Sequence, residues 1–320
     1  TVIETSIFDL RGNALAQTVR KYSDEALAAL IETQAITSSY DMRDRQVHSR
    51  IITTNSLGSF VDRQEIDYLS YDAYGNVVDQ DIARYGETDA LIDYKVIHNE
   101  YLDPLAARRG NATHTTITRF ADIAKTLEIE RQEISNLSFD LKGNIVDQRI
   151  DLYVASTFVR ETLIHNSNIS PQGDAGNQEI TGFITDALGA LIETSYQYIT
   201  NRVFDSDSNV KNQQVLNYLD RTKAILLDVQ EIRNELFDSR GNVLVQKIAT
   251  FTDETLSTLL DVKVITNENL DALGNASRVT ILKYAAGFID AQGYIQYSNF
   301  MDGTVIETSI FDLRGNALAQ

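Results

Sequence analysis

The 320-residue chain is 43% hydrophobic and 23% charged, a composition typical of a folded protein with a core rather than of a disordered one. Its net charge of −18 opposes binding to nucleic acid or to an anionic membrane, and no apolar run reaches the roughly 18 residues that a membrane-spanning helix needs. Because cysteine is absent, disulfides, thiolate catalysis and cysteine-ligated zinc are excluded. We therefore expect no nucleic-acid partner and no insertion into a membrane.

The first predicted element is a turn inside the opening stretch TVIETSIFDLRGNALAQ. Its core, FDLRGN, has an aromatic residue followed by Asp-x-x-Gly-Asn. The Asp side chain can accept hydrogen bonds from backbone N–H groups two residues on, and Gly supplies a positive φ after two right-handed residues. This pattern predicts a type I turn closed by a bulge, which joins two antiparallel strands.

Close relatives of this turn recur along the chain as YDAYGN, FDLKGN, FDSRGN and LDALGN. The residues that we assign to structural turns are Asp9, Gly12, Asn13, Asp72, Gly75, Asn76, Asp140, Gly143, Asn144, Asp238, Gly241, Asn242, Asp271, Gly274 and Asn275. Weaker copies are expected at Asp41, Asp103, Asp174 and Asp205. A turn therefore falls at intervals of roughly 31 to 41 residues.

A second, looser signal lies midway between these turns. Segments such as SDEALAALIE, TDALGALIE and TDETLSTLLD place an apolar pair and an acid seven or eight residues after Asp. Ala, Leu and Glu favour a helix, but Gly58 and Gly189 fall inside sister copies and the flanks are short. We interpret these segments as the turns at the opposite ends of the hairpins.

The sequence segments between the turns are typical of strands. IDLYVAS and DVKVIT alternate apolar and polar residues, Val, Ile, Thr and Tyr are abundant, and only two prolines occur. The sequence thus predicts an all-β fold: a continuous antiparallel meander of long hairpins, with strands of roughly 8 to 13 residues and very little helix. Where the alternation of apolar and polar residues is irregular, as in ILLDVQEI, we expect β-bulges.

The chain closes with the same seventeen residues that open it, at 304–320. We interpret residues 1–303 as one higher-order repeat of nine hairpin units, about 18 strands, and residues 304–320 as the start of the next identical repeat in a longer tandem array. Since a chain that restarts its pattern has not closed on itself, we expect the meander to coil into a spiral or tube rather than a closed barrel.

The turns FDLRGN, YDAYGN, FDLKGN and FDSRGN resemble the YD repeats of Rhs-type and teneurin-like proteins. The resemblance is confined to the Asp-x-x-Gly turns. It implies a spiral β-sheet that forms a hollow shell, although the repeat here is longer and Asn-Val or Asn-Ile follows the turn where that family often has Arg-Leu or Arg-Ile.

No residue pattern predicts chemistry. The four histidines, His48, His98, His114 and His165, have no metal-ligand spacing, and the DSDSN run at 205–209 fails as a calcium loop because no Gly follows and Leu216 stands at its twelfth position. We therefore predict no catalytic residue, no metal, no cofactor and no enzymatic activity.

Three functions are compatible with this pattern. The first is an acidic structural protein of the cell surface or extracellular space, in which tandem repeats pair with one another, or with other copies, to build a tube, filament or sheath. The second is an Rhs-type shell or surface adhesin that encloses or presents another domain. The third is an outer-membrane β-barrel, which the lack of Trp and of aromatic girdles opposes.

Overall fold

A computed structural model describes residues 1–22, 26–238, 240–312 and 315–319. Three parts of the expected turns, namely residues 23–25, Ser239 and residues 313–314, lie outside the described residues. The chain divides into two compact units: unit 1 contains Thr1–Ile134 and Leu152–Phe158, and unit 2 contains Ser135–Asp151 and Val159–Gln320. Each unit is described by itself below.

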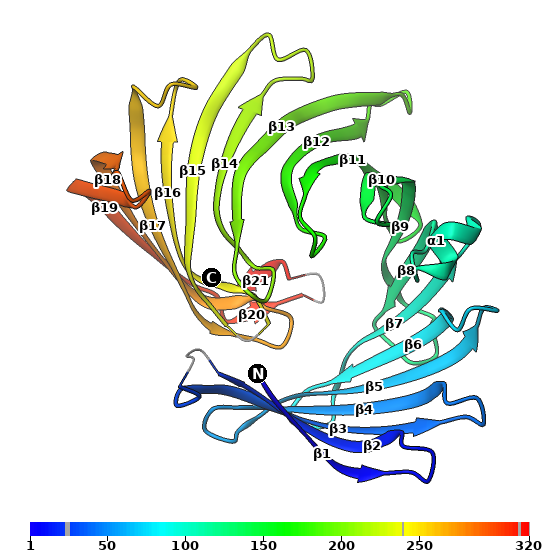
Figure 1. Cartoon of the computed structure of the whole chain (residues 1–320). Helices are drawn as coiled ribbons and strands as arrows, with labels where there is room; N and C mark the ends of the chain where they lie inside the picture. Colours follow the sequence, from blue (N-terminus) through cyan, green and yellow to red (C-terminus); the bar gives the residue numbers. More distant parts are fainter. Residues whose placement is uncertain (23–25, 239, 313–314, 320) are drawn as a thin grey trace. The chain divides into compact units, whose positions relative to one another are not determined.

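Unit 1 is an antiparallel meander in which each strand from β1 to β8 pairs with the next strand along the chain (Figure 1). Its strands are β1 (Val2–Phe8), β2 (Ala14–Tyr22), β3 (Leu30–Tyr40), β4 (Gln46–Asn55), β5 (Phe60–Tyr71), β6 (Val77–Tyr85), β7 (Leu91–Glu100) and β8 (His114–Phe120). Three further strands have residues in both units: β9 (Glu128–Phe139), β10 (Ile145–Val154) and β11 (Thr157–Ile169).

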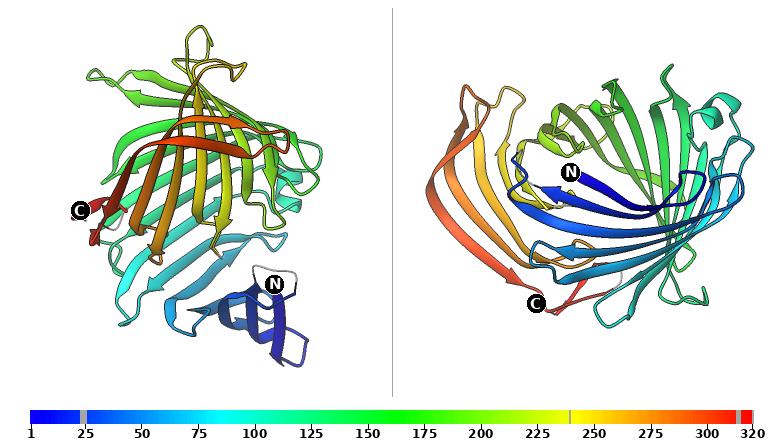
Figure 2. Two further views of the ribbon diagram at one scale, coloured as in Figure 1. Left: turned by 90° about the vertical axis from the view of Figure 1, so that its left-hand side faces the viewer. Right: turned by 60° about the horizontal axis from the view of Figure 1, so that its bottom comes forward.

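Unit 2 repeats the same plan from β11 to β19. Its strands are β12 (Ala175–Thr185), β13 (Leu191–Phe204), β14 (Val210–Tyr218), β15 (Leu226–Phe237), β16 (Val243–Phe251), β17 (Leu259–Leu270), β18 (Ala276–Ile289) and β19 (Ile295–Glu307). A short pair, β20 (Ile310–Phe311) and β21 (Ala317–Ala319), follows. Figures 1 and 2 show β12 to β19 side by side in chain order as one curved ribbon.

The prediction of an all-β meander of long hairpins with very little helix is confirmed. The strands from β1 to β19 contain 7 to 14 residues. The described residues contain one helix, α1 (Pro104–Arg108), which Asp103 caps. Over the described residues, neither unit closes into a barrel within itself. The coiling of the whole meander into a spiral or tube stays a prediction.

β-Bulges explain the smeared alternation. In the ILLDVQEI segment, Asn217 of β14 pairs with Asp228 while the adjacent Tyr218 pairs with Leu226, so Leu227 is an extra residue and is 55% exposed. The same shift occurs at the start of β17, where Thr250 pairs with Asp261 and Phe251 with Leu259. Such a bulge increases the local twist of the sheet.

Unit 2 buries apolar side chains on both faces of the curved ribbon. The larger cluster comes from strands β13 to β17 and β19 and contains Tyr196, Leu216, Tyr218, Val229, Ala249, Phe251, Val262 and Ile295. A smaller cluster, Ile199, Val215 and Ile232, lies on the opposite face, because Val215 and Leu216 are consecutive in β14. The β18–β19 turn also folds back toward β15, because Arg233 Nε donates to the carbonyl oxygen of Gly293 at 2.7 Å. Curvature within the sheet thus lets it cover part of its own apolar face.

No helix among the described residues is long and apolar enough to cross a membrane.

Candidate functional site

Hydrogen bonds within the motif close the Asp-x-x-Gly-Asn turns, as the turn after β9 illustrates. The Asp140 N–H donates to Asn144 O at 2.9 Å, and the Gly143 N–H donates to Asp140 O at 3.0 Å. Asp140 Oδ1 accepts from the backbone N–H groups of Lys142 and Asn144, both at 2.8 Å, while Oδ2 accepts from Asn144 Nδ2 at 2.9 Å. Gly143 has a φ of 91°. The carboxylate is therefore committed to holding the turn.

These hydrogen bonds lower the pKa of the Asp140 carboxyl, chiefly through the backbone N–H of Asn144. The other predicted turns have the same acceptor geometry: Asn13, Asn76, Asn242 and Asn275 each donate both a backbone and a side-chain N–H to the preceding Asp. The glycines of these turns have φ between 82° and 92°. In each of these turns the Asp carboxyl is therefore hydrogen-bonded to the Asn that closes the turn.

The Asn of one turn also lies against the Gly of the next turn along the same edge of the sheet. A Cβ built on Gly241 would lie 2.5 Å from Asn209 Oδ1, and one built on Gly274 would lie 2.8 Å from Asn242 Oδ1. In unit 1, Asn76 Nδ2 donates to Ala107 O at 2.6 Å. We name this row of successive Asn–turn contacts the turn ladder. It gives the glycine a second reason to lack a side chain, besides its positive φ.

Three weaker copies occupy the same positions with substituted residues. Asp44 and Ser208 take the place of Gly with φ of 62° and 63°. After Asp103 the turn is enlarged into helix α1. The DSDSN run is a turn in which Asp205 accepts from Asp207 N and Asn209 N through Oδ1 and from Asn209 Nδ2 through Oδ2.

The assignment of Asp174 as a turn acid is wrong. The turn lies four residues earlier, because Ser170 N donates to Asp174 O at 2.8 Å and Gly173 N donates to Ser170 O at 3.1 Å. Ser170 Oγ replaces the Asp carboxylate and accepts from the N–H groups of Gln172 and Asp174. Pro171 at the second position fits this turn because its φ is fixed near the required value.

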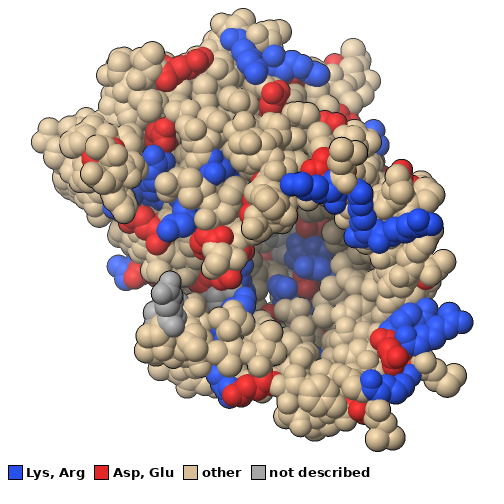
Figure 3. All heavy atoms as spheres, in the orientation of Figure 1, with Lys and Arg blue, Asp and Glu red and all other residues tan. Residues whose placement is uncertain are grey.

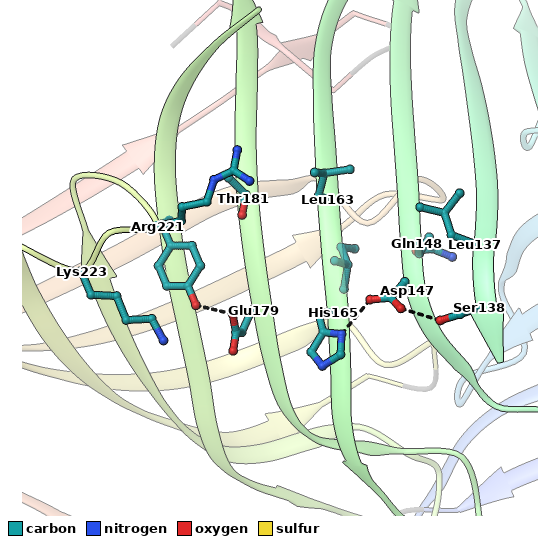
Figure 4. A pocket seen from close by; sticks show the side chains of 12 residues that line it. Leu137, Ser138, Asp147, Gln148, Leu163, His165, Glu179, Thr181, Arg221 and Lys223 are labelled. Atoms are coloured by element: carbon teal, nitrogen blue, oxygen red, sulfur yellow. Dashed lines mark hydrogen bonds and ion pairs between the residues drawn. The ribbon is translucent and has the colours of Figure 1, made fainter. Parts of the chain in front are cut away.

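A hollow of about 540 Å³ in unit 2 is a concave candidate for a site (Figure 4). It is lined by Leu137, Ser138, Asp147, Gln148, Leu163, Ile164, His165, Glu179, Thr181, Tyr196, Arg221 and Lys223. At its centre Asp147 bridges two strands, accepting from Ser138 Oγ at 2.5 Å and lying 2.7 Å from His165 Nδ1. These two contacts, with Ser138 the stronger, lower the pKa of Asp147.

The order of these three side chains does not suit nucleophilic catalysis. In a serine nucleophile the hydroxyl donates to His, which Asp orients, whereas here Asp147 stands between Ser138 and His165. Across the hollow, Tyr196 OH donates to Glu179 Oε2 at 2.5 Å, and burial together with this bond raises the pKa of Tyr196 well above its usual range. The phenol is thus held as a protonated donor.

An equivalent trio occurs in unit 1. Ser70 Oγ donates to Asp79 Oδ2 at 2.5 Å, and His98 Nδ1 lies 2.6 Å from Asp79 Oδ1. In both copies the Ser lies two residues before a turn Asp and the acid lies three residues after the turn Asn. That spacing in the sequence could have predicted a side-chain contact between neighbouring strands. Its recurrence away from the hollow indicates a repeated structural part.

A row of alternating charges crosses five strands of unit 1, and the sequence did not reveal it. Arg84 Nε lies 3.8 Å from Asp62 Oδ2, Arg119 Nε lies 3.1 Å from Asp93 Oδ2, and Arg119 Nη1 lies 2.8 Å from Glu130 Oε1. Asp62 and Asp93 are 2% and 1% exposed. We name this row, from β5 to β9, the charge row. The acidic residues of the charge row are those that follow an apolar pair after the looser turns. We had interpreted this sequence pattern only as a marker of those turns.

The described residues hold no group of three or more His, Asp or Glu side chains arranged for a metal ion. His48 Nδ1 instead lies 2.7 Å from Asp67 Oδ1, and His48 Nε2 lies 3.2 Å from Glu65 Oε2. Acidic and basic side chains are intermingled on the face seen in Figure 3.

No family model matches the chain, and no curated protein matches it either. Among solved structures it is similar to TcdB2-TccC3-TEV, with 9% identity and a TM-score of 0.24, and to TcdB2-TccC3, with 10% identity and a TM-score of 0.18. A further similarity is to the Photorhabdus luminescens Tc holotoxin pore, with 10% identity and a TM-score of 0.14. The matches cover 92% to 94% of this chain but only 19% to 22% of those chains.

Proposed function

We propose that the chain is a structural protein without catalytic activity, which builds an extracellular tube, filament or sheath from tandem 303-residue β-repeats. The observation that carries this proposal is the turn ladder, in which the Asn side chain of one turn contacts the next turn along the edge of the sheet. The motif residues that would have to serve a reaction are already hydrogen-bonded within the fold. The identical ends of the sequence support a block that is repeated along the array.

The charge pattern fits a surface exposed to water. The net charge of −18 keeps neighbouring assemblies apart, and the buried acids of the charge row have basic partners. Sheet pairing between blocks requires only backbone hydrogen bonds, which any strand offers at its edge. The partners of one block are therefore other blocks of the same kind.

Electron microscopy of the native assembly tests this proposal. We expect long tubes or filaments with a regular repeat along their axis. Isolated globular particles under native conditions would contradict a filament. If the complete gene encodes a distinct cargo or tip domain beside the repeats, the shell or adhesin alternative replaces the filament.

A further inference from the structure

The repeated seventeen residues form the same hairpin at both places. Ile7 pairs with Ala16 and Phe8 with Ala14 in the first copy; Ile310 pairs with Ala319 and Phe311 with Ala317 in the second. Both turns are closed by the same bonds, since Asp9 N donates to Asn13 O and Asp312 N donates to Asn316 O, each at 2.9 Å. The two copies therefore share these strand pairs and this turn closure at the residues described in both.

The second copy is covered by the hairpin that precedes it. Thr304 to Glu307 pair with Ile281 to Arg278 of β18, with Ile306 opposite Val279. Thr308 is 7% exposed and its N–H donates to Ser277 O at 2.8 Å. A Cβ built on Gly315 would lie 2.5 Å from Asn275 Oδ1, so the turn ladder continues onto the second copy.

The equivalent residues of the first copy are more exposed. Ile3 and Phe8 are 62% and 58% exposed, whereas their equivalents Ile306 and Phe311 are partly buried. A Cβ built on Gly12 meets no atom within 4 Å. Strand β1 pairs with β2 along one of its edges. Its other edge corresponds to the edge of residues 304–307 that pairs with β18.

We propose that the edge of β1 opposite β2, together with the face of Gly12 that corresponds to Gly315, forms the acceptor for the β18 strand and Asn275 of a preceding copy of this block. The register follows from the second copy: Glu4 lies opposite Arg278, Ile3 opposite Val279 and Val2 opposite Thr280 of that preceding copy. This junction rests on the proposed assembly from tandem blocks and specifies how one block meets the next. In the 320-residue chain, residues 304–307 already occupy the β18 edge, so a second copy competes with them.

The test uses the complete chain and exploits the identity of the two copies. A release variant, Ile306→Pro with Gly315→Val, weakens only the occupant of the β18 edge, because Pro removes a backbone donor and Val at positive φ is strained beside Asn275. A blocked variant adds the matched changes Ile3→Pro and Gly12→Val. Light scattering over a range of protein concentrations measures association.

We expect the release variant to associate as its concentration rises and the blocked variant to remain monomeric. A synthetic peptide with the sequence TVIETSIFDLRGNALAQ should bind the release variant and protect the amides of Arg278 to Ile281 from hydrogen exchange. The same peptide carrying Pro and Val at its third and twelfth positions should bind more than about tenfold more weakly.

Two results together would contradict the proposed junction: the release variant stays monomeric, and the peptide does not protect the β18 amides of that variant. Circular dichroism of the variants verifies that the sheets remain folded. The peptide measurement tests the junction even if another contact limits the association of whole chains. The junction and the filament fail separately: peptide protection without tubes removes the filament alone, and tubes without peptide protection remove this junction alone.

Discussion

At the scale of single residues, two separable features favour glycine at the turns: a positive φ and, at some turns, close contact with the Asn of the preceding turn. Gly189 and Gly241 lie in unit 2 with nearly equal φ, 83° and 82°. A Cβ on Gly189 would meet nothing within 4 Å, whereas a Cβ on Gly241 would lie 2.5 Å from Asn209 Oδ1. Asn209 cannot retreat freely because its Nδ2 donates to Asp205 Oδ2 at 3.0 Å.

This pair predicts the energetic contribution of the turn ladder. Gly189→Ala should cost about 1 kcal/mol from backbone strain alone, and Gly241→Ala should cost measurably more because Asn209 must also move. Chemical denaturation of the two variants measures the difference. Adding Asn209→Ala to each variant provides the control: it should reduce the excess at Gly241 and not alter the cost at Gly189. Equal costs for the two glycine variants would show that the ladder carries no strain.

Gly143→Val isolates a turn that the sequence predicted. A β-branched residue at a φ of 91° is strained by about 1 to 3 kcal/mol. Hydrogen exchange of the amides from 139 to 148 should therefore accelerate, while amides at the opposite end of β10 retain their protection. Unchanged exchange across these residues would contradict the turn.

The turn acids also predict a dependence on pH, which is clearest at Asp41. Its pKa is lowered to about 2, first of all by the Arg45 side chain, whose Nε and Nη2 donate to Oδ2 at 2.8 and 2.6 Å. A depressed pKa in the folded state means that the stabilisation is present above the ordinary Asp value, about 3.9, and is lost as the pH falls toward 2. Carbon NMR of the Asp41 carboxyl during acid titration measures this.

Arg45→Ala should shift the titration of Asp41 to higher pH. Arg43→Ala removes a positive charge from the same turn and serves as the control, because Arg43 contributes its backbone N–H to Asp41 Oδ1. An equal shift in both variants would attribute the low pKa to general charge rather than to the Arg45 contact.

At the scale of elements, the sequence predicted where strands end better than what their side chains contact. Asp-x-x-Gly-Asn is a local motif whose bonds all lie within five residues, so its turns could be located by inspection. We predicted the turn at Ser170 four residues too late, because Ser and Pro replace the usual first residues of the motif. The nearby sequence GDAGN resembles the motif and was taken for it. The charge row could not be predicted from the sequence, because Asp93 and Arg119 lie on different strands and their contact depends on the register of the strands.

The charge row predicts an asymmetry between single and paired substitutions. Arg119→Leu leaves Asp93, which is 1% exposed, and Glu130 without their shared cation, and this should cost about 3 to 5 kcal/mol. Replacing all three charges by apolar residues should restore much of that stability. Arg50→Leu is the control within the same unit: its side chain is 47% exposed and its pair with Glu65 spans 3.4 Å, so the cost should stay below about 1 kcal/mol.

Urea denaturation followed by circular dichroism measures these differences. A loss at Arg119 no larger than the loss at Arg50 would mean that water reaches the row and screens it. Such a result would also make the burial of Asp62, the next acid of the row, energetically unimportant.

At the scale of the whole molecule, two electrostatic effects oppose each other when blocks meet. Every chain carries a net charge of −18, so approaching copies repel one another over roughly the Debye length, about 30 Å at 0.01 M salt and 3 Å at 1 M. The junction itself contains one opposite-charge pair by analogy with Arg278 and Glu307, whose side chains are 47% and 75% exposed and lie 3.9 Å apart. Pairs this exposed contribute little.

Salt should therefore strengthen the association of the release variant, Ile306→Pro with Gly315→Val, because it screens the general repulsion more than it weakens one exposed pair. Light scattering at a fixed protein concentration, with sodium chloride raised from low to high, measures the change. Adding Glu4→Gln to the release variant is the control, and its salt dependence should remain the same. If salt instead weakens association, and Glu4→Gln removes that weakening, local attraction at the β1 edge governs how blocks meet and the net charge does not.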